Sequence, residues 1–305
     1  MLLHEFPDIQ WLKKQIQTGF ENQTRRYGIG LLRSGWPTVI LNTTARRIRR
    51  ENIAGPLSLF TNLRGKSTIT VNGRQATVSE NTFFVSNPRQ EYTLVIPDEA
   101  ETFNIHVGEK IGEAVWLEAT HSHHFLLDHP FDISSSPDFR NRIHWRDAHF
   151  NALLPQLAGA GSEFREEELL GDLIYLLLDE KIKSARNSQR LSVTKSSTRE
   201  EIAKRLHLAV DYIYTHFEKN LSLDLLSKVS CLSKFHFVRL FKEYFRESPH
   251  QFITRIRLEK SIAYLRSSAY GVREIAEKVG ISDSSSFSRL FRNRFGIYPT
   301  RFTIA

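Results

Sequence analysis

Basic side chains recur 50 residues apart near the end of the chain, at positions where they could contact DNA. Arg239 and Lys242 in the first group correspond to Arg289 and Arg292 in the second. An arginine can donate two hydrogen bonds to the O6 and N7 atoms of guanine, and either side chain can neutralise a phosphate. Each group therefore carries the chemistry needed to read a base edge and to contact the DNA backbone.

The two groups lie within a repeated segment. Residues 223–249 and 273–299 are identical at eight of 27 aligned positions. Each copy has the pattern of a short helix, a turn and a longer helix whose apolar side chains fall on one face. Ser233 and Asp283 are suited to cap the longer helices, because their side-chain oxygens accept hydrogen bonds from unpaired backbone N–H groups. The sequence thus predicts two helix-turn-helix units with basic outer faces.

The excess positive charge is confined to the part of the chain that holds this repeat. Residues 199–305 contain 19 Lys and Arg against 11 Asp and Glu, a net charge of +8, whereas residues 1–198 contain 23 of each kind. This partition is typical of a domain that binds a polyanion such as double-stranded DNA. The alternative is a helical bundle whose arginines serve only solubility.

Several positions in the second copy form a specific motif. They are Ile275-Ala276, Gly280-Ile281, Phe287, Leu290-Phe291, Phe295-Gly296 and Pro299. With them, residues 199–305 resemble the DNA-binding domain of the AraC/XylS transcription regulators. The resemblance implies an all-α domain in which a long helix joins two helix-turn-helix units and places their second helices in successive major grooves of DNA.

Capping signals predict the remaining helices of this domain. Residues 249–266 would form the joining helix, because Ser248 and Gln251 are spaced as a capping box. A leading helix is expected over residues 199–217, with Thr198 and Glu201 as its capping box.

The resemblance also implies which side chains contact DNA. The predicted DNA-binding residues are Phe235, His236, Val238, Arg239, Lys242, Ser285, Ser286, Arg289 and Arg292. Lys242 and Arg292 are expected to contact phosphates rather than bases, and His236 is expected to lie at the surface or contact phosphate. The others would contact base edges.

The first half of the chain has a different pattern. Short alternating segments between residues 38 and 107 are separated by turn residues, and Asn72-Gly73 predicts a tight hairpin. The stretch Ile69-Thr-Val71-Asn-Gly73, with Glu80-Asn81 and Asn87-Pro88, is similar to the cupin barrel that AraC-type regulators use to bind an effector. We therefore predict an α+β protein of two domains, with a cupin-like β-barrel (jelly roll) and effector site within residues 1–138.

The ligand of this barrel cannot be assigned from the sequence. The cluster Arg46-Arg47-Ile-Arg49-Arg50 could attract an anionic effector, although a solvated edge strand is the commoner explanation. A metal-dependent cupin enzyme is the alternative function, but the hairpin lacks the usual His-x-His pair and Tyr92 stands where a late histidine would fall. We predict no catalytic residue, metal or cofactor. One cluster of histidines could bind zinc or copper but is more typical of solvated or core-satisfied side chains, and it consists of His121, His123, His124 and His129, beside Asp128.

A helical segment is predicted between the two domains, over residues 139–183. Its helices would span residues 139–154 and 164–183, and the second has a broad apolar face. This face could pack on its own barrel or pair across a two-fold axis, and we expect a homodimer. The polar residues 184–198 are expected to form a flexible linker. The residues assigned to the dimer surface are Leu170, Leu173, Ile174 and Leu177.

These features together predict a bacterial transcription regulator, an activator that responds to a small-molecule effector and could contact RNA polymerase. A ligand-independent regulator is the alternative within the class. The chain has no basic and apolar signal segment at its start and no apolar run of about 18 residues, so we expect a soluble cytoplasmic protein without membrane contact.

Overall fold

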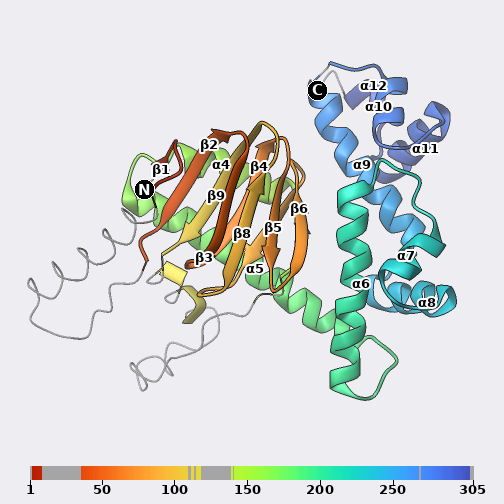
Figure 1. Ribbon diagram of the computed structural model, residues 1–305. Coiled ribbons are helices and arrows are strands. Elements are labelled where there is room, and N and C mark those ends of the chain that lie inside the picture. Colours follow the sequence, from red (N-terminus) through yellow and green to blue (C-terminus); the bar gives the residue numbers. More distant parts are fainter. Residues whose placement is uncertain are drawn as a thin grey trace, which may run out of the picture. The chain divides into compact units, whose positions relative to one another are not determined.

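The computed structural model describes residues 2–8, 36–108, 111–112, 115–117, 139, 141–267 and 269–302. The chain divides into two compact units, Met1–Ile182 and Lys183–Ala305. Within the described residues, the first unit is rich in strands and the second is helical (Figure 1). The predicted combination of a sheet-rich first part and an all-α second part is confirmed.

The first unit contains two β-sheets. The six-stranded sheet has the order β1 (Leu2–Leu3), β2 (Val39–Ala45), β9 (Ala100–Val107), β4 (Leu57–Arg64), β7 (Thr82–Ser86) and β10 (Ile143–Trp145). The four-stranded sheet has the order β3 (Ile48–Ala54), β8 (Glu91–Ile96), β5 (Ser67–Val71) and β6 (Arg74–Val78). Hydrogen bonds among these strands do not close the two sheets into one barrel.

The predicted hairpin connects β5 to β6. Val71 pairs with Arg74, and the two residues between them, Asn72 and Gly73, have φ angles of 50° and 73°. Positive φ at both central positions is what a two-residue hairpin turn requires, so the Asn-Gly prediction is confirmed.

Side chains of strand β9 point alternately to the two faces of the six-stranded sheet. Phe103 and Ile105 belong to a hydrophobic core that also contains residues of α4 (Ala148–Ala158) and α5 (Glu163–Gln189). Asn104 and His106 alternate with them along the strand and line a cavity together with residues of the four-stranded sheet. The sheet therefore packs on helices with one face and borders a cavity with the other.

The four leucine and isoleucine residues assigned to a dimer surface lie in this same core. Each is at most 1% exposed, because strands of the chain's own six-stranded sheet cover them. The expectation that they pair with a second chain is corrected accordingly, and the alternative that the helix packs on its own sheets is the one observed. The residues concerned are Leu170, Leu173, Ile174 and Leu177.

The first predicted helix of this segment also needs correction. Residues 143–145 form strand β10, which pairs with β7, and α4 begins only at Ala148. Asp147 sets this start, because its side chain accepts a hydrogen bond from the backbone N–H of Phe150. A helix over residues 139–154 would have left that edge of β7 without its partner strand.

The second unit contains the predicted pair of helix-turn-helix units. The first consists of α7 (Leu223–Val229) and α8 (Lys234–Phe245), and the second of α10 (Val272–Lys278) and α11 (Ser284–Phe295). They are joined by α9 (Pro249–Ser267), preceded by α6 (Ser196–His216) and followed by α12 (Pro299–Phe302).

Among the helices that the structure describes, none combines the length and the apolar character that a membrane span requires.

The segment expected to be a flexible linker is ordered by contacts within the second unit. Helix α5 continues through the first part of this segment to Gln189. Within it, Ser184 Oγ lies 2.9 Å from the hydroxyl of Tyr244. The N–H of Ser192 donates to the carboxylate of Glu243 at 3.0 Å. Polar composition alone predicted a linker, but these polar groups bond to α8 instead.

Helix α6 also begins earlier than predicted. Its N-terminal flanking residue is Lys195, which makes no side-chain cap, so Thr198 and Glu201 lie inside the helix and do not form a capping box. Glu201 instead accepts a hydrogen bond from Arg205, one turn further along.

The turns of the two helix-turn-helix units differ by one residue. The first helices begin 49 residues apart, at Leu223 and Val272, whereas the second helices begin 50 apart. The left-handed position is Cys231 in the first turn, with a φ of 52°, and Gly280 in the second, with a φ of 81°. A constant spacing of 50 therefore misaligns the first helices, and the identity of Lys228 with Lys278 is not a structural correspondence.

Gly280 is predicted to be indispensable in the second turn. A Cβ atom there would lie 2.4 Å from the backbone oxygen of Glu218, in addition to the cost of its positive φ. Gly296 has a similar φ of 79° but no atom within 4 Å of such a Cβ, so it is the matched control. We expect Gly296→Ala to lower the free energy of unfolding by about 1 kcal/mol and Gly280→Ala by a further ~1–3 kcal/mol. Urea unfolding followed by circular dichroism would measure both, and equal losses would contradict the clash.

Candidate nucleic-acid interface

Helix α8 has one buried face and one exposed face. Phe237, Leu240, Phe241 and Tyr244 are buried, each at most 4% exposed. Ser233 caps the helix by accepting from the N–H of His236, as predicted. The cap and the buried face together fix which side chains point to solvent.

The exposed side of α8 carries an aromatic ring beside basic groups. Phe235 is 75% exposed, although an aromatic ring of this size is usually buried. Arg239 is also exposed, and its side chain makes no hydrogen bond or ion pair with the described residues. An apolar ring can contact the methyl group of thymine, and a free guanidinium can bond guanine.

Helix α11 repeats this arrangement with different side chains. Asp283 caps it by accepting from the N–H groups of Ser285 and Ser286, at 3.2 and 2.8 Å. Hydrogen bonds from Ser286, and then from Ser285, hold the pKa of Asp283 below its ordinary value. Phe287 and Phe291 are fully buried beneath the helix. The predicted cap is therefore confirmed, and it leaves a short, polar N-terminal turn exposed.

The structure places the predicted DNA-binding residues on these two surfaces. Val238 and Ser286 are half-buried, and the others are exposed. Their assignment to particular bases or phosphates stays a prediction. The exposed residues are Phe235, His236, Arg239, Lys242, Ser285, Arg289 and Arg292.

The sequence did not identify Tyr298 as part of this surface. Arg292 donates a hydrogen bond to the Tyr298 hydroxyl at 2.6 Å, and its guanidinium lies 4.8 Å from the centre of that ring. Arg273 joins Arg289 and Arg292 in lining a shallow hollow beside α11. The position of Tyr298 just before Pro299 corresponds to Ser248 before Pro249, a difference that comparison of the two copies could have indicated.

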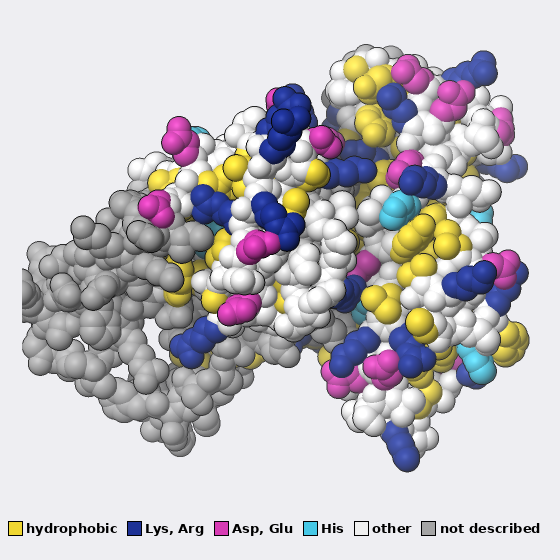
Figure 2. All heavy atoms as spheres, viewed as in Figure 1, with side chains coloured by type: hydrophobic (Ala, Val, Ile, Leu, Met, Phe, Trp, Pro, Cys, Tyr) yellow, Lys and Arg dark blue, Asp and Glu magenta, His cyan; other side chains and the backbone are white. Residues whose placement is uncertain are grey.

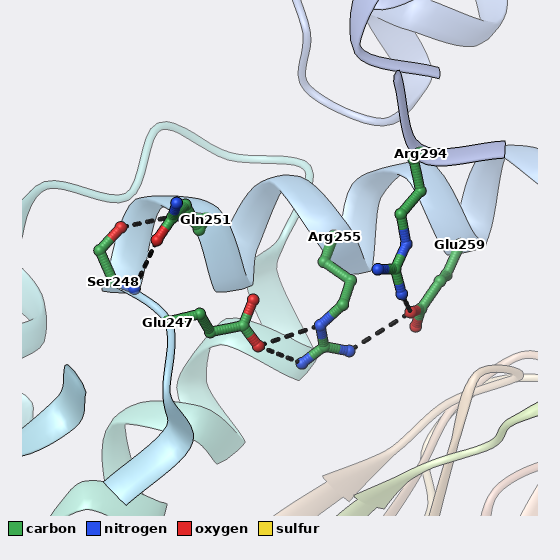
Figure 3. A network of polar contacts seen from close by, with 6 residues as sticks. All are labelled: Glu247, Ser248, Gln251, Arg255, Glu259 and Arg294. Carbon is green, nitrogen blue, oxygen red and sulfur yellow. Dashed lines mark hydrogen bonds and ion pairs between the residues drawn. The ribbon is translucent and has the colours of Figure 1, made fainter. Parts of the chain in front are cut away.

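Helix α9 is connected to both helix-turn-helix units by a charged network (Figure 3). The guanidinium of Arg255 donates two hydrogen bonds to Glu247, at 3.0 and 2.9 Å, and contacts Glu259 at 3.3 Å. Glu259 also contacts Arg294 of α11 at 3.4 Å. The network therefore runs from the end of the first helix-turn-helix unit, along α9, to the second helix-turn-helix unit.

Part of this network is sheltered from solvent. The side chains of Glu247, Arg255 and Glu259 are 25%, 26% and 27% exposed. Burial lowers the pKa of Arg255, but the hydrogen bond to Glu247 and the nearby carboxylates raise it above its ordinary value overall. Arg255 also lies over the ring of Phe252, 4.6 Å from its centre. We infer that the guanidinium braces the joint between α8 and α9.

Figure 1 shows α8 and α11 at the same edge of the second unit, with α9 running between the two helix-turn-helix units. On the face drawn in Figure 2, basic side chains lie over several of these helices, together with acidic ones. The net positive charge of this part of the chain is therefore not one continuous patch on that face.

A metal-dependent enzyme was the alternative function for the strand-rich unit, Met1–Ile182. Among the described residues, no three His, Cys, Asp or Glu side chains form a group that could hold a metal ion. The histidine cluster proposed from the sequence, His121 to His129, lies outside the described residues.

Two capped helices with exposed basic faces, joined by one long helix, define a double helix-turn-helix DNA-binding protein. Residues 226–303 match the family model of a helix-turn-helix domain. The chain is 30% identical over 176 residues to LumQ, a probable transcriptional regulator of Photobacterium leiognathi. This alignment covers 57% of this chain and 67% of LumQ. The chain therefore belongs to the AraC/XylS family, and it is a DNA-binding transcription regulator.

The chain is also similar to two further proteins. The chain is 30% identical over 159 residues to the transcriptional activator RhaS of Escherichia coli, an alignment covering 51% of this chain and about half, 55%, of RhaS. A solved transcriptional regulator of Chromobacterium violaceum with an AraC-type DNA-binding domain is 27% identical. It covers 33% of this chain and 90% of its own, with a TM-score of 0.32.

The brace can be tested with one variant and one control. Arg255→Met leaves Glu247 without its partner and Glu259 with only Arg294, and we expect it to lower the free energy of unfolding by about 1–2 kcal/mol. Arg273→Met removes only the ion pair with Glu277, in which Arg273 is 87% exposed, and should cost less than about 0.5 kcal/mol. Denaturant unfolding measures both, and equal effects would show that the sheltered network has no special role.

Proposed function

We propose that the protein is an effector-responsive activator that recognises two adjacent DNA half-sites with α8 and α11. The observation that carries this proposal is that the guanidinium of Arg239 is exposed and makes no hydrogen bond or ion pair with the described residues, and that its counterpart Arg289 is also exposed, each on a capped helix of one compact unit. Because its partner would be chromosomal DNA, we propose that the protein acts in the bacterial cytoplasm.

The two half-sites would be read differently. The first helix-turn-helix unit offers the ring of Phe235 for a thymine methyl group and Arg239 for a guanine. The second offers only small serines before Arg289, so its base preference would depend mainly on that arginine. Lys242 and Arg292 would neutralise phosphates, which adds affinity without adding sequence preference.

Arg289→Ala and Lys242→Ala separate these two roles. Loss of a bidentate base contact should weaken binding to the specific site by ~1–3 kcal/mol and relax the preference for one base pair. Loss of a phosphate contact should weaken binding to specific and random DNA alike and reduce the salt dependence. Binding titrations on both DNAs at several salt concentrations give the comparison. An equal loss on both DNAs for Arg289→Ala would contradict base reading.

We propose activation as the direction of regulation. Its support is that RhaS, which aligns with half of this chain, is named an activator. An activator has to help RNA polymerase, so we propose that a DNA-bound copy contacts the polymerase. The effector would act by binding more tightly to one of two arrangements of the protein, since a ligand can shift an equilibrium only by its difference in affinity.

We propose that two copies associate through the outer face of α5. Phe164, Tyr175 and Ile182 are 79%, 43% and 49% exposed, and their spacings of 11 and 7 residues place them on one side of the helix. That side is opposite to the buried leucines. Exposed apolar side chains aligned over about five turns are typical of an interface between helices.

Changing Phe164 and Ile182 together to Glu should therefore produce a monomer. Static light scattering should report a mass near the chain mass of 35.4 kDa for this variant and about twice that for the unaltered protein. Leu63→Glu is the control, because Leu63 is also an exposed apolar residue, at 37%, but lies on β4. A mass that does not change in the double variant would refute this interface.

A further inference from the structure

A cavity of about 320 Å³ lies between the two sheets of the first unit. Its volume falls within the range of pockets that hold small molecules. Most of its wall is apolar, from Phe6, Trp36, Leu41, Phe60 and Leu94 among others. The polar groups are few, and their positions decide which ligand the cavity can hold.

Arg50 supplies a positive charge to this cavity. Arg50 on β3 pairs with Leu94 on β8, which also lines the cavity, and its neighbour Arg49 points to the opposite face because side chains alternate along a strand. Arg49 is exposed and pairs with Glu51, whereas Arg50 lines the cavity. Strand β3 is an edge strand, as the sequence suggested, but one of its arginines faces inward.

Among the described residues, one hydrogen bond uses a donor of Arg50. Its Nη1 donates to the carbonyl of Pro7 at 2.9 Å, and its guanidinium lies 4.9 Å from the centre of the Phe6 ring. Burial lowers the pKa of Arg50, while Tyr92 and Asp8 raise it. A guanidinium has five N–H donors and stays protonated at neutral pH, so it can still bind an anion.

Asn104 presents a buried polar group without a partner. The residue is 2% exposed, and its Nδ2 atom has no hydrogen-bond partner among the described residues. An unsatisfied buried amide costs free energy comparable to a lost hydrogen bond, and a ligand atom in the cavity would remove that cost.

His106 offers a hydrogen-bond acceptor beside it. Ser58 Oγ donates its only proton to the carbonyl of Pro56 at 2.8 Å. Nδ1 of His106 lies 2.8 Å from Ser58 Oγ, so Nδ1 must be protonated and donate to that oxygen. The other nitrogen, Nε2, is then an acceptor. Burial lowers the pKa of His106 to about 4, so the ring is neutral at pH 7.

Two other ionisable groups line the cavity. Burial raises the pKa of Tyr92, so its hydroxyl stays protonated and can donate a hydrogen bond. Glu91 is exposed and is not among the charges that act on Arg50. The cavity thus combines one cation, an exposed carboxylate and neutral polar groups with apolar walls.

We propose that this cavity binds a small organic acid with an apolar body, whose carboxylate contacts Arg50 and whose hydroxyl group accepts a hydrogen bond from Asn104 and donates one to His106. A sugar fits less well, because its many hydroxyl groups would face apolar walls without partners. This inference rests on the proposed effector function and names the chemical class of the effector. Because Arg50 is less buried than Asn104, the acid would enter with the end that carries the hydroxyl group first, and its carboxylate would follow.

The test uses three probes that differ by one group each. They are 3-(4-hydroxyphenyl)propanoate, 3-phenylpropanoate, which lacks the hydroxyl group, and 3-(4-hydroxyphenyl)propan-1-ol, which lacks the charge. In calorimetric titrations of the full chain, we expect the hydroxylated acid to bind about ten-fold or more tightly than the alcohol, the difference expected of a charge-assisted hydrogen bond. It should also bind more tightly than the acid without a hydroxyl group.

Two substitutions on one strand assign this preference. Arg50→Gln should abolish the advantage of acid over alcohol, and Arg49→Gln should leave it unchanged. Asn104→Leu should remove the advantage of the hydroxylated acid over 3-phenylpropanoate. Thermal unfolding of each variant without ligand shows that the unit remains folded.

Three results would overturn the proposal. They are equal affinity for acid and alcohol, an equal effect of Arg50→Gln and Arg49→Gln, and no heat of binding with any probe at millimolar concentration. DNA binding is measured separately, with and without the hydroxylated acid. If the acid binds through Arg50 but leaves DNA affinity and transcription unchanged, the effector function fails while the ligand class stands.

Discussion

The DNA-binding unit depends on the burial of one helix, α9, in two hydrophobic cores. Near its start, Phe252 packs edge-to-face against Phe241 of α8, with ring centres 5.4 Å apart. Further along, Leu258 and Leu265 belong to a second core with Phe287 and Phe291 of α11. Because a helix is a stiff rod, packing both reading helices onto it restricts their relative position. The network of Arg255 adds a directional contact at the same joint, whereas apolar packing alone is not directional.

The two helix-turn-helix units share this support but present different chemistry. The first reading helix exposes an aromatic ring and a free arginine, and the second exposes serines and an arginine whose neighbour, Arg292, is held by Tyr298. The turns differ as well, since Cys231 occupies a left-handed position for which glycine, as at Gly280, is the usual residue. The repeat therefore preserves the buried faces and varies the exposed ones, as expected when one scaffold reads two different half-sites.

The first unit uses strand alternation to combine a core with a ligand site. On β9, Phe103 and Ile105 pack toward α4 and α5, while Asn104 and His106 border the cavity. A ligand that contacts Asn104 would thus touch a strand whose opposite face holds the helical core. This continuity gives the cavity a direct mechanical connection to α5, the helix whose outer face we propose as the contact between copies.

The sequence by itself determined the helix-turn-helix pair, the caps at Ser233 and Asp283, and the hairpin at Asn72-Gly73, because these follow from local periodicity and backbone chemistry. It did not determine partners across the chain. The burial of Leu173, the strand at residues 143–145 and the helical continuation past Lys183 each depend on contacts with distant residues. Arg50 faces the cavity because β3 pairs it with Leu94 of β8, and only the tertiary structure shows that its neighbour Arg49 points to solvent. Local propensity is encoded within a few residues, whereas burial is a property of what the folded chain places alongside them.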